Sequence, residues 1–120
     1  MAEKIYDLEK RSFFFARDCR MLLKKIPKTI QTIEDGKQLV RSSGSVGANY
    51  IEANEALSRK DFYYRIKISR KEAKESIYWL SLLQVCNLEF EADILTLIQE
   101  ATELKKIFSS ILEKSSIVSS

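Results

Sequence analysis

Near the middle of the chain lies the segment Arg41-Ser42-Ser43-Gly44-Ser45-Val46-Gly47-Ala48-Asn49-Tyr50-Ile51-Glu52-Ala53-Asn54-Glu55, which is rich in small side chains. It contains two of the three glycines of the chain, inside a segment with helical periodicity. Each glycine costs a helix up to about 1 kcal/mol relative to alanine, so a gain in packing must offset it. We therefore predict that helices approach closely at Gly44 and Gly47. The alternative is a loop over 42–47 that divides the helix.

Outward from this segment, apolar residues recur at alternating spacings of three and four, which predicts four amphipathic helices. We place them at about 4–26, 29–56, 59–86 and 89–114 of a single domain, 1–120, with 115–120 as a fraying tail. Pro27 ends the first helix, Ser58 caps the third, and Asn87 closes it in a left-handed conformation. Helices of this length with short links predict an all-α, antiparallel up-down-up-down four-helix bundle.

Each helix has a predicted core stripe. In chain order the four stripes are Ile5, Leu8, Ser12, Phe15, Cys19, Leu22 and Ile26; Ile30, Ile33, Val40, Gly44, Gly47 and Ile51; Phe62, Ile66, Ser69, Ala73, Ser76, Leu80 and Leu83; and Phe90, Ile94, Leu97, Ala101, Leu104, Phe108 and Ile111. If the second and third helices are antiparallel and joined near Leu57, Gly47 lies level with Ile68. The same register predicts an ion pair between Arg41 and either Glu75 or Glu72.

Some large apolar residues lie off these stripes. Phe13 and Phe14 do so on the first helix, and a further group on the third helix consists of Ile68, Trp79, Leu82 and Cys86. A helix that is apolar on more than one face is buried on more than one face, so we expect other copies of the chain to cover these residues. For the two phenylalanines the alternative is that the core stripe of the first helix is wide enough to include them.

Composition narrows the class of protein. Hydrophobic residues make up 45% and charged residues 31% of the sequence, and the net charge of +3 permits an acidic partner. No apolar run is long enough to span a bilayer, and residues 3–7 are too charged for a signal peptide. Cys19 and Cys86 fall at apolar helical positions, so we expect buried free thiols in a reducing cytoplasm. The absence of histidine excludes His-based general base catalysis.

Several segments together resemble a known family. They are Pro27-Lys28, the run from Gln38 to Ala53 with its Ser-Gly-Ser-Val-Gly-Ala-Asn core, Lys71-Glu72-Ala73-Lys74-Glu75-Ser76, and Trp79-Leu80. They are similar to the four helix bundle proteins encoded in intervening sequences of bacterial large-subunit ribosomal RNA genes. That family is related to the accessory variability determinant of diversity-generating retroelements. Many members continue with Ala-Glu-Gly after the position of Ile51, whereas this chain has Glu52-Ala53-Asn54-Glu55.

The resemblance implies a four-helix bundle that assembles into a homopentameric ring. It also implies a partner, either nucleic acid or a reverse transcriptase, because the retroelement relative looks like a basic pentamer that engages both. Intervening-sequence members are suspected of binding RNA.

Basic side chains and two tyrosines fall on the outer faces of the first and third helices. As candidate nucleic-acid-binding residues we take Lys10, Arg17, Lys24, Lys60, Lys67, Lys71, Lys74, Tyr64 and Tyr78. The lysines would contact phosphates and the tyrosines would stack on bases. The alternative is a solvated lysine face without a ligand.

A second group is assigned to helix seams and assembly: Arg41, Gly44, Gly47, Asn49, Glu72, Glu75, Trp79, Phe13 and Phe14. Glu52, Glu55, Glu72 and Glu75 form Glu-x-x-Glu pairs, but di-metal bundles normally use Glu-x-x-His. We therefore predict no metal and no cofactor, and we expect Arg41 and Asn49 to be the partners of these carboxylates. The Gly44–Gly47 run lacks the lysine and the preceding strand of a phosphate loop, and its serines lack a base.

These observations favour a non-enzymatic homo-oligomeric scaffold that binds RNA or DNA through basic surfaces. The alternative is a structural or protein-interaction module, for example a reverse-transcriptase accessory protein, that does not contact nucleic acid directly.

Overall fold

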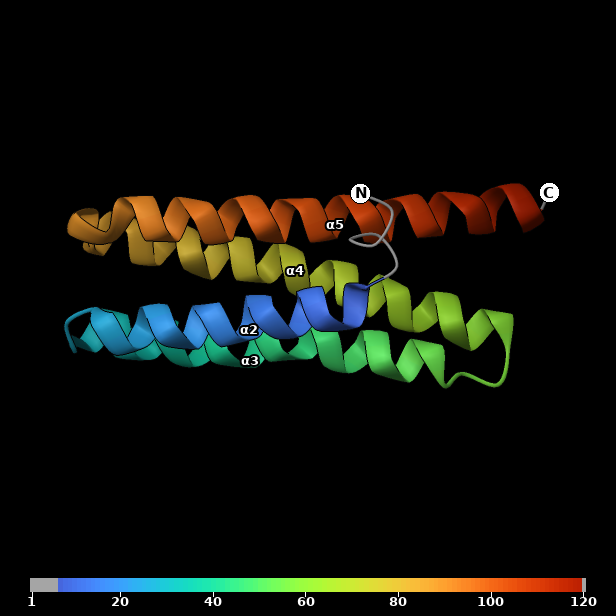
Figure 1. Ribbon diagram of the computed structural model, residues 1–120, viewed down its shortest axis with the longest axis horizontal. Coiled ribbons are helices and arrows are strands. Elements are labelled where there is room, and N and C mark those ends of the chain that lie inside the picture. The colour runs from blue at the N-terminus through green and yellow to red at the C-terminus, as the bar shows by residue number, and fades with distance from the viewer. Residues whose placement is uncertain (1–6, 120) are drawn as a thin grey trace.

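Four long helices form the described part of the chain, and residues 7–119 contain no strand. The computed structural model describes the backbone of residues 7–119 and the side chains of residues 7–114. Helix α2 spans Leu8–Lys25, α3 Ile30–Asn54, α4 Arg59–Cys86 and α5 Glu91–Ser119, and a 3-10 turn, η1, covers Leu88–Phe90 (Figure 1). The prediction of an all-α, four-helix chain is confirmed.

Polar side chains set the helix starts. The Thr29 hydroxyl accepts a hydrogen bond from the Thr32 amide at 3.2 Å, and the Ser58 hydroxyl accepts one from the Asp61 amide at 3.1 Å. Both supply a partner to an amide that a helix N-terminus leaves unpaired. Asn87 ends α4 at φ −138°, so the predicted left-handed conformation is wrong. Its buried side chain instead donates to the Leu83 carbonyl at 2.9 Å.

The helix ends differ modestly from the predicted ones. The third helix has the predicted bounds, and the second is shorter at both ends. Of the first predicted helix, residues 4–6 and its core residue Ile5 lie outside the described residues. The fourth helix continues past 114 to Ser119.

The order of helices around the bundle decides which surfaces can cooperate. Helix α3 packs against α2 and α4, and α5 also packs against α2 and α4. The helices α2 and α4 therefore lie at opposite corners of the bundle. Hydrogen bonds join Thr32 to Asn87 and Ser42 to Ser76, so residue numbers rise along α3 as they fall along α4.

The core stripes of three helices are as predicted. Phe15 and Cys19 of α2, Ile66 and Leu80 of α4, and Phe108 of α5 are fully buried. Phe62, Phe90 and Ile111 are the partly buried members of the predicted stripes of α4 and α5.

The predicted stripe of α3 is wrong. Ile30, Ile33 and Ile51 are exposed, whereas the buried residues are Thr32, Gly36, Leu39, Ser42, Ser43, Val46 and Ala53. Serine hydroxyls between α3 and α4 form hydrogen bonds across this contact. Ser42 Oγ lies 2.8 Å from Ser76 Oγ, and Ser69 donates to the Val46 carbonyl at 2.9 Å. Small hydroxylic residues therefore fill the contact with α4, and the isoleucines face outward.

Residues 42–47 are continuous α-helix, so the loop alternative is excluded. The close approach that the glycines predict is present at Gly47, where an added Cβ would lie 3.1 Å from Cβ of Ser12. That neighbour belongs to α2. The hydrogen bond from Ser69 of α4 to the Val46 carbonyl of α3 agrees with the predicted register of Gly47 with Ile68, but the Cβ position of the glycine faces α2. The glycine brings α3 close to α2 rather than to α4.

The two cysteines have different environments. Cys19 is fully buried, and desolvation raises the pKa of its thiol to about 12. Cys86 is exposed, so the prediction that both thiols are buried is wrong for this one. It occupies the last position of α4, next to the exposed Val85.

This difference predicts selective alkylation. The thiolate is the reactive form, so at pH 8 iodoacetamide is expected to modify Cys86 within minutes and to leave Cys19 unmodified while the chain is folded. Mass spectrometry of the digested product measures both sites, and denaturant supplies the control in which both react. Equal labelling in the native chain would contradict the buried position of Cys19.

Candidate nucleic-acid interface

The outer face of α4 carries an unbroken row of basic and aromatic side chains. Its members follow one another at spacings of four, three, four, three and four: Lys60, Tyr64, Lys67, Lys71, Lys74 and Tyr78. At about 100° per residue they share one face, opposite the buried Ile66, Ala73 and Leu80. All six are exposed. We call this set the α4 row.

Positive charge is concentrated on this helix. α4 contains seven Lys or Arg residues against three Asp or Glu residues, so its net positive charge exceeds the +3 of the whole chain. Among the described residues, no carboxylate lies within ion-pair distance of Lys60, Lys67 or Lys74. Lys71 lies 4.0 Å from Glu75, the outer limit of such a contact. Three of the four lysines are therefore free to bind anions.

Arg41 of α3 engages the two glutamates of α4 that lie beside the row. Its guanidinium nitrogens lie 3.0 Å from a Glu75 oxygen and 3.4 Å from a Glu72 oxygen. The structure thus contains both ion pairs that the sequence offered as alternatives. Glu72 is nearly buried, so its charge needs this partner. Because Arg41 holds both carboxylates, they compete less for the lysines of the α4 row.

The basic residues of α2 do not join this surface, because α2 lies at the opposite corner of the bundle. Lys10 pairs with Asp7 at 3.7 Å, and Arg17 pairs with Asp18 at 2.9 Å. The guanidinium of Arg17 also lies over the Phe14 ring, 4.6 Å from its centre. The nine predicted nucleic-acid-binding residues therefore divide into two separate faces, and the face on α2 is partly neutralised.

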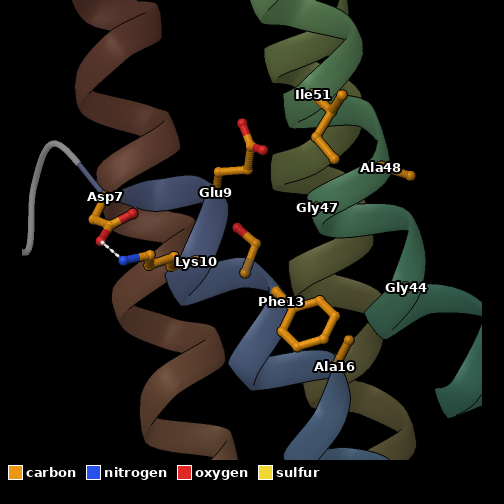
Figure 2. Close-up of a pocket in the computed structure, with 10 residues that line it drawn as sticks. Asp7, Glu9, Lys10, Phe13, Ala16, Gly44, Gly47, Ala48 and Ile51 are labelled. Atoms are coloured by element: carbon orange, nitrogen blue, oxygen red, sulfur yellow. Dashed lines mark ion pairs between the residues drawn. The ribbon is translucent and has the colours of Figure 1, made fainter.

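A groove of about 680 Å³ runs between α2 and α3. Figure 2 shows Phe13 and Ala16 on its α2 side and Gly44, Gly47 and Ile51 on its α3 side. Phe13 is 65% exposed and Ile51 44% exposed, so both rims of this α2–α3 groove present apolar surface. The buried hydroxyl of Ser12 also lines the groove, and no described residue forms a hydrogen bond with it.

The remaining assembly candidates have mixed surroundings. Phe14 is exposed, and Trp79 is partly buried against the core. The buried indole N–H of Trp79 has no hydrogen-bond partner among the described residues. Asn49 accepts a hydrogen bond from Arg65 at 3.1 Å. The expectation that Asn49 binds a glutamate is therefore wrong.

Sequence reasoning missed two arginines that tie helices together. Arg11 of α2 makes a two-pronged ion pair with Glu100 of α5 at 2.7 and 3.0 Å, and this hydrogen bonding raises the pKa of Arg11. Arg20 donates to the Val40 carbonyl at 3.3 Å, and its guanidinium lies over Gly44. The helix order is needed to predict the Arg11–Glu100 pair, because α2 and α5 are not consecutive in the sequence.

Within residues 7–119 no helix is long and apolar enough to cross a membrane. The same described part contains no group of three or more metal-ligating side chains.

Comparisons with known proteins agree on one family. The family model of the 23S rRNA-intervening sequence protein matches residues 4–110. A crystal structure at 1.70 Å resolution, of a protein with unknown function from the S23 ribosomal protein family of Bacteroides thetaiotaomicron VPI-5482, is similar in sequence and fold. The identity is 33% and the TM-score 0.75, over 86% of this chain and 95% of that one. No curated protein matches the chain.

Proposed function

The chain belongs to the family of 23S rRNA-intervening sequence proteins, and we propose that it is a non-enzymatic homo-oligomeric scaffold that binds RNA or DNA. The observation that carries the proposal is the α4 row, where four lysines and two tyrosines share one exposed face. Lysines bind phosphates as point charges and release counterions, which gives affinity without sequence preference. We assign nucleic-acid contact to this face rather than to α2, where Lys10 and Arg17 have carboxylate partners.

Assembly is the second part of the proposal. Each subunit is an antiparallel up-down-up-down bundle, and five copies form a ring in the cytoplasm. The α2–α3 groove supports self-association, because a protein seldom leaves rims as apolar as Phe13 and Ile51 in water without a partner. A ring repeats the α4 row once per subunit, so weak contacts add through high effective concentration.

The test is binding of a structured RNA across a salt series. If all four lysines of one row contact phosphates, the logarithm of the affinity is expected to fall with the logarithm of salt at a slope of about −3 to −4. Fluorescence anisotropy with a labelled RNA of fixed sequence measures this slope. Absent or salt-insensitive binding would contradict the proposal.

The α2–α3 groove also favours a second candidate function, a protein-interaction module. In that case a partner such as a reverse transcriptase, rather than another copy, covers Phe13 and Ile51. The salt series separates the two candidates, because a partner held by apolar contacts leaves the chain without salt-dependent RNA binding.

A further inference from the structure

We infer that the α4 row binds single-stranded rather than duplex nucleic acid, an inference that rests on the proposed function. It starts from the two tyrosines. Tyr64 and Tyr78 are 60% and 59% exposed, although tyrosine is an amphipathic residue that usually buries its ring. By contrast, Tyr50 and Tyr63 are packed against the core. The rings of the α4 row therefore lie mostly outside the core of the single chain.

The order along the helix is the second step. Tyr64 and Tyr78 bracket the three lysines Lys67, Lys71 and Lys74 on one straight face. At 1.5 Å per residue the two tyrosines are about 21 Å apart. A tyrosine, three lysines and a second tyrosine therefore lie in one line along the helix. This order fits a single sugar–phosphate backbone that runs along the helix, with one base stacked on the tyrosine at each end.

The stacking surface of Tyr78 is supported from below. Its ring packs edge to face on Trp79 with the ring centres 5.0 Å apart, and Trp79 in turn packs against the core. This contact limits the freedom of the ring, so less entropy is lost when a base stacks on it.

A duplex would leave these rings unused. Its bases are already stacked on one another, and the deep major groove of A-form RNA does not admit side chains. Duplex phosphates would still attract the lysines, but the tyrosines would contribute nothing. A single strand uses every member of the row, so it is the ligand class that fits all six residues.

The experiment compares strands of one sequence. We would use the full chain at low salt and labelled strands of about 12 nucleotides, in RNA and in DNA, each alone and annealed to its complement. Anisotropy is expected to show at least about tenfold tighter binding of the single strand in one or both chemistries. The double variant Tyr64→Leu/Tyr78→Leu is expected to lose at least about tenfold of single-strand affinity and less than about twofold of duplex affinity.

The matched control is Tyr64→Phe/Tyr78→Phe, which retains both rings and is expected to bind as the wild type does. Equal affinity for single strand and duplex, or an unchanged affinity in the leucine variant, would overturn the inference and leave the proposed function standing. Binding to none of the four probes would overturn both.

Discussion

Changing Lys67, Lys71 and Lys74 together to glutamate is expected to abolish nucleic-acid binding. The change places carboxylates on three consecutive positions of the α4 row, so phosphates meet repulsion where they met attraction. The fold is expected to survive, because all three side chains are exposed and each change costs a helix only a few tenths of a kcal/mol. Anisotropy measures the binding, circular dichroism the helix content, and light scattering the assembly.

The matched control reverses the same number of charges on the other face, with Lys10, Arg17 and Lys24 changed to glutamate. Both variants shift the net charge from +3 by six units, to −3. A general electrostatic effect would therefore weaken both equally. We expect the α2 variant to retain most of the affinity, because its face lies at the opposite corner. Unchanged binding in the α4 variant, or equal losses in the two, would refute the assignment to the α4 row.

The sequence predicted the helices well because large apolar residues mark most of them. The stripes of α2, α4 and α5 contain Phe, Leu and Ile at helical spacing, and burial followed that pattern. On α3 the rule selected the wrong face. There the buried positions include Ser42 and Ser43, whereas Ile30 and Ile33 are exposed. Where helices pack closely, small size rather than hydrophobicity selects the residue, and a hydrophobic pattern cannot detect that.

The candidate site was predictable only within one helix. The α4 row follows from spacing alone, because residues three and four apart share a face. Whether Lys10, Arg17 and Lys24 join that row depends on which helices are neighbours, which spacing within a helix does not specify. The ion pairs of Arg41 were predictable because a short link fixes the register of α3 against α4. The ion pair of Arg11 with Glu100 joins α2 to α5, which α3 and α4 separate in the sequence. A short link does not fix the register of these two helices, so the pair was not predictable.

Replacing Gly47 by leucine is expected to lower the free energy of unfolding by about 1–3 kcal/mol, the range for overpacking a closed contact. An added Cβ already lies 3.1 Å from Cβ of Ser12 and 3.8 Å from the Ser12 carbonyl carbon, so leucine must displace the backbone of α2. The gain in helix propensity of up to about 1 kcal/mol offsets only part of that cost. For a chain of 120 residues the melting temperature is expected to fall by about 4 °C per kcal/mol.

Gly44→Ala is the matched control on the same helix. The nearest atom to its added Cβ is Nη2 of Arg20 at 3.3 Å, the end of a flexible side chain that can move aside. Helix propensity then dominates, and alanine is expected to stabilise the chain by about 0.5–1 kcal/mol. The melting temperatures of both variants are measured by thermal unfolding followed by circular dichroism.

Light scattering compares the masses of the two variants with about five times 13.9 kDa, the mass of the proposed wild-type ring. If Gly47→Leu melts at the wild-type temperature, α2 and α3 are not in close contact at this glycine. If it melts early but assembles normally, the groove contributes to the fold and not to the ring.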